Sequence, residues 1–228
     1  MIANQKKFYS GAILLSGFMV VLIIIFMPVF NGHNGLSYLD SLYNSISKGS
    51  AYYIPKLKEE AVEFSGRSIT LTLNLADERQ AGEIQPLFEK GGASVELSGK
   101  ALKISGDLAA IMANCLADAD DMFANYGDKV AAKYGYGERQ VLYNWWLALK
   151  EADKNLSRQK KFSEAKFIAT VSKKAVECAY NYYQIEPKDI SDKYGLVIFS
   201  LIFYVFYTLL YGFGIMTLLE GLGLRLGH

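Results

Sequence analysis

The fold is decided by two stretches without a charged residue, FYSGAILLSGFMVVLIIIFMPVF at residues 8–30 and YGLVIFSLIFYVFYTLLYGFGIMTLL at residues 194–219. At about 1.5 Å per residue, a helix of either length exceeds the roughly 30 Å hydrocarbon core of a bilayer. Backbone polar groups in lipid need partners within the segment, so both stretches are predicted to be transmembrane helices. Residues 31–193 then form one extracytoplasmic domain, and residues 220–228 form a short cytoplasmic tail.

The charged residues indicate an orientation and argue against a nucleic-acid partner. Only Lys6, Lys7, Arg225 and Glu220 lie outside the middle segment, which therefore holds 21 of the 24 basic and 22 of the 23 acidic residues. That near-neutral balance lacks the clustered basic excess of a nucleic-acid-binding surface. By the positive-inside rule, the three basic residues place both termini in the cytoplasm and the domain outside. We expect an integral protein of a bacterial inner (plasma) membrane.

The middle segment contains one clear strand. Residues 68–75, SITLTLNL, alternate strictly between polar and apolar side chains, which predicts a strand with one buried face. Two further strands are expected at 93–97 and 101–104, around a turn at 98–100. A helix from Asp77 to about Lys90 separates the first strand from this hairpin. The order β-α-β-β predicts a small α/β core.

Helices are predicted to surround this core. Apolar residues recur at three- and four-residue spacing over about 36–46, 55–64, 107–126 and 138–183. The first of these is expected to end at the Lys48-Gly49-Ser50 sequence, and the last to kink near residues 155–163. The predicted fold class is an α+β membrane protein, in which two terminal transmembrane helices flank one extracytoplasmic α/β domain with a small sheet and long helices.

The second apolar stretch carries a polar stripe, formed by Ser200, Tyr204, Tyr207 and Tyr211. Their spacings of four, three and four place them on one helical face. Tyr204 lies about 15 Å beyond Tyr194 along the helix, near the predicted bilayer centre. A phenol at that depth needs a hydrogen-bond acceptor that lipid tails do not provide. We therefore expect the stripe to contact a partner, with a quinone-like ligand or a pore as alternatives.

Aromatic residues cluster in the middle segment at Tyr143, Trp145 and Trp146, close to Tyr134 and Tyr136. Such a patch is able to stack a sugar or to line a ligand cleft. The alternative is that these rings form part of the domain core, or an aromatic belt at the membrane surface. The sequence leaves both interpretations open.

The sequence contains no motif that indicates an enzyme, a cofactor site or a metal site. It has no glycine-rich phosphate loop, no G-x-S-x-G nucleophile motif and no C-x-x-C pair. The two histidines, His33 and His228, are expected on opposite sides of the membrane, which excludes a paired-histidine haem within one subunit. We therefore expect no catalytic residue, no cofactor and no metal.

Two smaller features receive structural interpretations. Cys115 and Cys178 are expected as small apolar residues on helices, with a disulfide as the alternative in an oxidising compartment. Asp118, Asp120 and Asp121 are expected on a solvated helix face. Asp120 turns about 200° from Asp118, so the three carboxylates do not converge on a metal.

Together these features favour a non-catalytic structural or accessory subunit of a membrane protein complex, whose second span contacts other membrane subunits or a second copy of the chain. An extracytoplasmic ligand-binding or regulatory module is one alternative, and it rests on the aromatic patch. A pore-forming homo-oligomer is another, with the tyrosine stripe lining the pore. Ion pores more often show a ring of charge, for which Glu220 is the only candidate.

The predicted topology resembles that of the polysaccharide co-polymerases, whose terminal spans also flank a helix-rich periplasmic domain. That resemblance implies a homo-oligomeric assembly scaffold. It is limited to topology, because residues 194–219 contain no proline, whereas the second span of that family is proline-rich. The domain at 31–193 is also short for that family.

Overall fold

The computed structural model describes residues 2–30 and 32–224, and the chain divides into two compact units. The first unit combines the residues up to Ile46 with those from Pro187 onward, and the second is Ser47–Glu186. The protein is mixed α+β, mostly helical, with one small antiparallel sheet. The coarse fold class predicted from the sequence is therefore confirmed.

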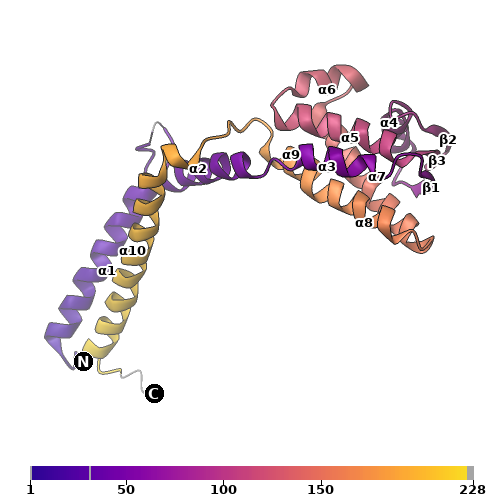
Figure 1. The fold of residues 1–228 in the computed structure, drawn as a ribbon. Coiled ribbons are helices and arrows are strands. Elements are labelled where there is room, and N and C mark those ends of the chain that lie inside the picture. Colours follow the sequence, from indigo (N-terminus) through magenta and orange to yellow (C-terminus); the bar gives the residue numbers. More distant parts are fainter. Residues whose placement is uncertain (1, 31, 225–228) are drawn as a thin grey trace. The chain divides into compact units, whose positions relative to one another are not determined.

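Two long apolar helices, α1 (Gln5–Phe26) and α10 (Tyr194–Gly221), pack side by side in the first unit (Figure 1). Ala3 and Asn4 donate their backbone N–H groups to the Gly221 carbonyl, each at 2.9 Å, so the start of α1 meets the end of α10. The helices therefore run antiparallel. Both are long and apolar enough to cross a membrane, and few of their residues are buried.

The ends of the apolar helices differ slightly from the predicted bounds. α1 ends at Phe26 because Pro28 disfavours a helical conformation at Met27, whose ψ of 143° is extended. α10 begins at Tyr194 as predicted but continues to Gly221, so Glu220 is helical. Arg225 and His228 lie outside the described residues.

Helix α2 (Gly35–Ser50) begins where Asn34 accepts a hydrogen bond from the Ser37 N–H at 2.8 Å. The predicted end at Lys48 was wrong, because the helix continues through Ser50. The Lys48 side chain is fully buried in the second unit, where its Nζ donates to Asn125 Oδ1 at 3.0 Å and to the Ile185 carbonyl at 2.6 Å. These bonds hold the final turn of the helix despite Gly49.

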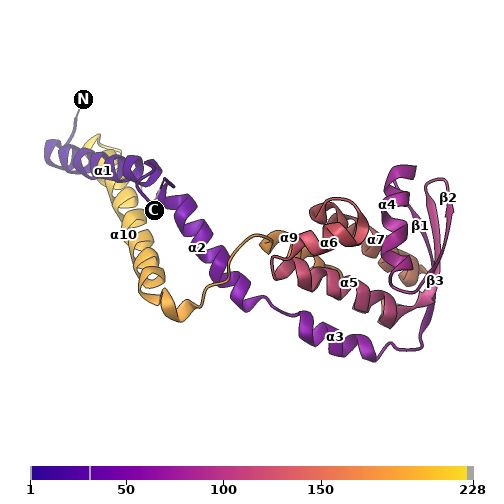
Figure 2. The same ribbon diagram turned by 90° about the horizontal axis from the view of Figure 1, so that it is seen from above.

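The sheet of the second unit has the strand order β1-β3-β2, with β1 (Ser68–Asn74), β2 (Ser94–Ser98) and β3 (Ala101–Asp107) all antiparallel (Figure 2). The alternation predicted for β1 is confirmed: Ile69, Leu71 and Leu73 are buried and their neighbours are exposed. The hairpin of β2 and β3 is also confirmed, although β3 extends to Asp107. One face of the sheet supplies the core.

Two aspartates begin the helices that cover this face. Asp77 accepts from the Gln80 N–H at 2.8 Å at the start of α4 (Glu78–Glu89), and Asp107 accepts from the Ala110 N–H at 2.9 Å at the start of α5 (Leu108–Phe123). Both caps follow the predicted positions. α5 ends before Tyr126, which was predicted to continue its apolar face and is instead exposed. The short helices α3 (Ile54–Val62) and α6 (Gly127–Tyr134) pack against α5.

The long helical region predicted for 138–183 is helical, and its interruption falls within the predicted range 155–163. It is divided into α7 (Glu138–Arg158), α8 (Phe162–Val171), a π-helical turn η1 (Ser172–Val176) and α9 (Glu177–Tyr182). The expected kink is a complete break at Lys160, whose φ of 61° is left-handed. α8 then packs back against α7. A 3₁₀ turn, η2 (Ile190–Asp192), precedes α10 in the first unit.

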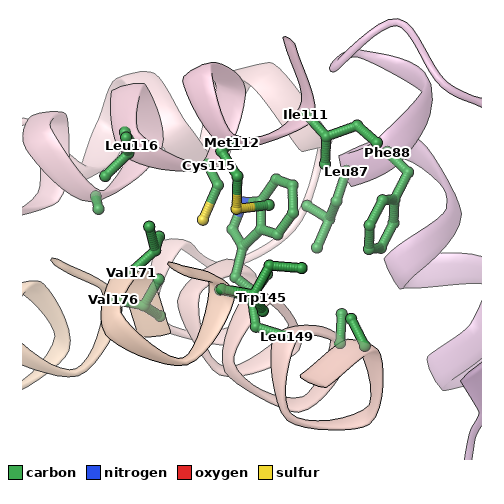
Figure 3. Close-up of a cluster of buried hydrophobic side chains, with 14 of the residues drawn as sticks. Leu87, Phe88, Ile111, Met112, Cys115, Leu116, Trp145, Leu149, Val171 and Val176 are labelled. Atoms are coloured by element: carbon green, nitrogen blue, oxygen red, sulfur yellow. The ribbon is translucent and has the colours of Figure 1, made fainter. Parts of the chain in front are cut away.

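The core of the second unit is continuous and centres on Trp145. Figure 3 shows the Trp145 indole among Met112 and Cys115 of α5 and Phe88 of α4. The Phe88 and Trp145 rings lie 5.4 Å apart with an interplanar angle of 58°. Such tilted contacts add to the stability gained by burying aromatic surface. The second unit therefore has its own packed interior.

Candidate functional site

The polar stripe of α10 divides into two parts. Ser200 and Tyr207 contact other helices of the first unit: Ser200 Oγ lies 2.6 Å from the Tyr43 hydroxyl, and Tyr207 donates to the Phe18 carbonyl at 3.4 Å. The Tyr207 ring also stacks on Phe18 at 4.5 Å. Half of the predicted contact residues are thus used within the chain itself.

The other two residues of the stripe are exposed, although the Tyr211 ring also lies against Phe18 of α1, with ring centroids 4.9 Å apart. Tyr204 is 65% exposed and Tyr211 is 45% exposed, and neither hydroxyl has a hydrogen-bond partner within residues 2–30 and 32–224. The aliphatic hydroxyls of α10 are satisfied by their own backbone, because Thr208 bonds to the Tyr204 carbonyl and Thr217 donates to the Phe213 carbonyl at 2.6 Å. A phenol is too long to make this local bond. Tyr204 and Tyr211 are therefore unsatisfied polar groups inside this helix, and Tyr194 at its first residue likewise has no hydrogen-bond partner in the described chain.

The two apolar helices approach closely at glycines. A Cβ atom added to Gly11 would lie 2.8 Å from Leu218 Cα, and one added to Gly214 would lie 2.9 Å from the Leu15 side chain. Sequence analysis did not single out Gly11. The neighbouring Gly17 has open space around it. Close packing at Gly11 and Gly214 fixes which face of α10 remains uncovered.

An ion pair joins the ends of the apolar helices. Lys7 Nζ donates to Glu220 Oε2 at 2.7 Å, and both side chains are partly exposed. Exposed pairs of this kind contribute little stability. The Lys7–Glu220 ion pair nevertheless marks the position along α1 and α10 at which the uncharged stretches end.

The aromatic patch predicted at Tyr143, Trp145 and Trp146 is split by the helix that carries it. Tyr143 and Trp146 stack with centroids 5.9 Å apart and line an open groove of about 470 Å3. Trp145 points the other way and is fully buried in the core. The groove is completed by residues that sequence analysis did not select: Leu142 of α7, Val176 of η1, and Glu177, Tyr180 and Asn181 of α9.

One polar contact orients the groove. The Trp146 indole Nε1 donates to Glu177 Oε1 at 2.9 Å, which links α7 to α9. Glu177 follows directly on the π-helical turn, and such turns occur frequently at functional sites. The cations of Lys150 and Arg139 lie against the Trp146 and Tyr180 rings, at 4.7 and 5.6 Å from the ring centroids. Neither cation lines the groove.

The acidic cluster contains a buried carboxylate that sequence analysis missed. Asp118 is 1% exposed, not on a solvated face as predicted. Its Oδ1 accepts from Lys133 Nζ at 2.5 Å, and its Oδ2 accepts from the Tyr134 hydroxyl at 2.6 Å and from Trp145 Nε1 at 2.8 Å. Burial and the nearby Asp118 charge raise the pKa of Tyr134. A carboxylate with three donors is suited to holding α5, α6 and α7 together.

The remaining candidates do not come together as a reactive or metal-binding centre within the described residues. Asp120 bonds to Tyr52 and Lys58, and Asp121 pairs with Lys129, so the three acids diverge. No group of three metal-ligating side chains is present in that part of the chain. Both cysteines are free: Cys115 lies in the core, where burial raises its pKa, and Cys178 is partly exposed.

His33 lies in the turn between α1 and α2, where its backbone pairs with that of Phe30. Its side chain is exposed. Nothing in the described chain joins it to a second metal ligand.

Comparisons of the chain with protein-family models, with curated protein sequences and with solved structures give no match. Function must therefore be argued from the residues of this chain alone.

Proposed function

We propose that the chain is a non-catalytic accessory subunit of a membrane protein complex. In this proposal, α1 and α10 form a helical hairpin in the bilayer, and the outward face of α10 contacts another membrane subunit or a second copy. The second unit is an extracytoplasmic domain. The observation that carries the proposal is the pair of exposed phenols at Tyr204 and Tyr211, whose hydroxyls have no partner within the described chain.

The hairpin is supported by the exposure of both apolar helices. The core helix of a soluble domain buries an apolar face, whereas only Gly11 of α1 and Ser200, Gly214 and Gly221 of α10 are buried. In water this surface would favour association, because soluble proteins rarely expose continuous apolar patches of this kind. In a bilayer the same surface is solvated by lipid tails. The hydroxyl groups of Tyr204 and Tyr211 would then lack a hydrogen-bond acceptor, because lipid tails provide none.

The depth of the phenols strengthens this argument. If the Lys7–Glu220 pair lies at the membrane surface, Tyr211 is about 14 Å and Tyr204 about 24 Å along α10 from that level. Both then lie within the roughly 30 Å hydrocarbon core. A buried hydroxyl without a hydrogen bond costs about 1–3 kcal/mol. A partner helix that offers acceptors would remove this cost.

The experiment compares two pairs of exposed aromatic residues on α10. Phe206 lies about 160° round the helix from Tyr204. Phe199 lies on the same side of the helix as Phe206. Tyr204→Phe with Tyr211→Phe removes two hydroxyls and keeps the ring shape. At about 0.6–2 kcal/mol for each hydrogen bond in a membrane, the double variant should weaken the assembly by at least roughly tenfold.

The assembly is measured by native gel and light scattering over a dilution series in non-ionic detergent. Phe199→Leu with Phe206→Leu is the matched control, and it should leave the midpoint almost unchanged. The proposal fails if the tyrosine variant assembles like the original chain, or if the original chain is monomeric and captures no other membrane protein.

The orientation is supported by Lys6 and Lys7 at the start of α1 and by Arg225 after α10. Both termini are then cytoplasmic and the second unit is outside. Glu59 is exposed on α3, and a Glu59→Cys variant in a background without Cys178 should react with a membrane-impermeant thiol reagent in intact cells. Labelling only after permeabilisation would reverse the orientation.

No observation favours the pore alternative over this proposal. Glu220, the candidate for a ring of charge, is already paired with Lys7 at 2.7 Å. The ligand-binding alternative does have support from the groove of the second unit.

A further inference from the structure

We propose that the groove between α7 and α9 binds a small organic cation with an alkylammonium or guanidinium group. The inference does not depend on the proposed membrane role, because every residue that carries it lies in the second unit. It rests on Glu177, on the aromatic rings beside it and on the absence of a counterion within the described chain.

Apart from the two tyrosines, Glu177 is the only ionisable side chain among those that line the groove. One carboxylate oxygen accepts from Trp146 Nε1 at 2.9 Å, which fixes the carboxylate against the indole. Within residues 2–30 and 32–224, no lysine or arginine nitrogen pairs with Glu177. A half-buried carboxylate beside apolar rings is poorly solvated, so a cation that enters the groove gains a counterion there.

Several other carboxylates of the second unit do have such counterions. Asp118 pairs with Lys133, Asp120 with Lys58, and Glu83 with Arg79. Lys150 and Arg139 are near the groove, but their cations lie against aromatic rings instead of pairing with Glu177. Asp128 and Glu138 also lack a lysine or arginine partner in the described residues, so what distinguishes Glu177 is that its unpaired carboxylate lines the aromatic groove.

The walls of the groove suit an organic cation better than a hydrated metal ion. Tyr143 and Trp146 form a stacked pair with an interplanar angle of 24°, and Tyr180 lines the same groove from α9. Aromatic faces attract organic cations and tolerate their apolar substituents, as in cages that recognise quaternary ammonium groups. Leu142 and Val176 add aliphatic surface. A metal ion would need several oxygen ligands, and Glu177 supplies the only carboxylate.

The π-helical turn explains how these residues meet. η1 adds an extra residue to the helical turn between α8 and α9, which shifts the register of the residues that follow. Val176, Glu177, Tyr180 and Asn181 therefore share the face toward α7 and line one groove. A regular helix would turn this face away by roughly the 100° that separates successive residues.

The chain itself provides the reporter for a test. It contains two tryptophans, and their indole N–H groups have different partners: Trp146 donates to Glu177 in the groove, whereas Trp145 donates to Asp118 in the core. Proton–nitrogen NMR spectra of the full chain, in a polyoxyethylene detergent, should show one indole signal for each. Tetramethylammonium, choline and methylguanidinium are titrated as probes, and 3,3-dimethylbutan-1-ol serves as the uncharged isostere of choline.

Binding in the groove should move the Trp146 signal in a saturable manner and leave the Trp145 signal in place. The uncharged isostere should bind at least tenfold more weakly than choline. Glu177→Gln keeps an acceptor for Trp146 and removes the charge, so it should weaken binding of the cations at least tenfold. Glu59→Gln, on the exposed surface of α3, is the matched control and should bind like the original chain.

Tyr143→Leu removes the ring stacked on Trp146 and leaves Glu177 unchanged. It should also weaken binding of the cations, so that the loss seen with Glu177→Gln is not explained by a folding defect at that one position. The inference is overturned if choline and its uncharged isostere bind equally, or if Glu177→Gln binds the cations unchanged. It is likewise overturned if none of the cations moves the Trp146 signal while a neutral monosaccharide does.

Discussion

The second unit and the apolar helices differ in how their polar side chains are hydrogen-bonded. In the second unit, the buried Asp118 accepts three hydrogen bonds and the buried Lys48 donates two, and Asp107 Oδ2 is the one buried side-chain oxygen without a partner in the described residues. On α10, Tyr204 and Tyr211 expose phenols without a partner in the described chain. If the helical pair lies in a bilayer, as proposed, its phenols need partners from outside the described chain, whereas Asp118 and Lys48 have theirs within the second unit.

The exposed edge of β1 also has its partners within the second unit. Asn155, Gln159 and Lys161 donate to the carbonyls of Thr72, Thr70 and Ser68, at 3.1, 2.9 and 3.4 Å. These side chains from the end of α7 take the place of a neighbouring strand. An open edge invites pairing with another chain. This edge of the sheet is therefore closed by the unit itself.

The strongest test of the second unit is a charge in its sheet. Leu71 is 1% exposed, so Leu71→Asp should bury an unpaired carboxylate and unfold the second unit, at a cost above about 4 kcal/mol. Thr72→Asp faces the exposed side, opposite Lys103, and should change the free energy of unfolding by less than about 1 kcal/mol. Denaturant unfolding followed by circular dichroism measures both. Equal effects would mean that both faces of β1 are buried.

A smaller loss is expected at the buried carboxylate. Asp118→Ala removes the counterion of the partly buried Lys133 ammonium, which keeps its hydrogen bond to Asn114, and takes the acceptor from Tyr134 and Trp145. The free energy of unfolding should fall by about 3 kcal/mol. Asp121→Ala removes an exposed pair with Lys129 and should cost less than about 1 kcal/mol. Tryptophan fluorescence reports the change directly because Trp145 donates to Asp118. Similar losses in the two variants would contradict the role given to Asp118.

The smallest effect concerns alkaline pH. Burial raises the pKa of Tyr136 to about 12, and the Glu83 carboxylate adds to the shift, while a hydrogen bond with Asn144 opposes it. Between about pH 10 and 12 the unfolded tyrosine loses its proton first, so stability falls as the pH rises. Tyr136→Phe should make this fall shallower in melting temperatures measured from pH 9 to 11.5. Tyr126→Phe, at an exposed position, should leave the slope unchanged.

Local patterns in the sequence predict several elements because those patterns act over a few residues. Strict alternation at 68–75 marks β1, and aspartates mark the starts of α4 and α5. The break between α7 and α8 carries no such signal, since its left-handed residue is Lys160 and not a glycine. The continuation of α2 depends on Lys48 reaching Asn125, a contact that local spacing does not reveal.

The candidate site was harder to predict because it depends on contacts between distant segments. Trp145 and Trp146 are adjacent, yet one is core and the other lines the groove. Helical spacing would have separated them, because Trp145 lies in register with Leu142, Leu149 and Ala152, which are all buried. Glu177 and Tyr180 have no sequence motif. Their position depends on the π-helical turn, which the sequence does not mark.

The central claim is that the Tyr204 face of α10 contacts another protein chain in the membrane. A photo-crosslinking amino acid is placed at position 204 or at position 206 of the full chain, expressed in its native membrane. Phe206 is 69% exposed on the other flank of α10, so both positions are accessible. We expect a protein adduct from position 204 and chiefly lipid adducts from position 206. Lipid adducts alone at position 204, with protein adducts at position 206, would contradict the account.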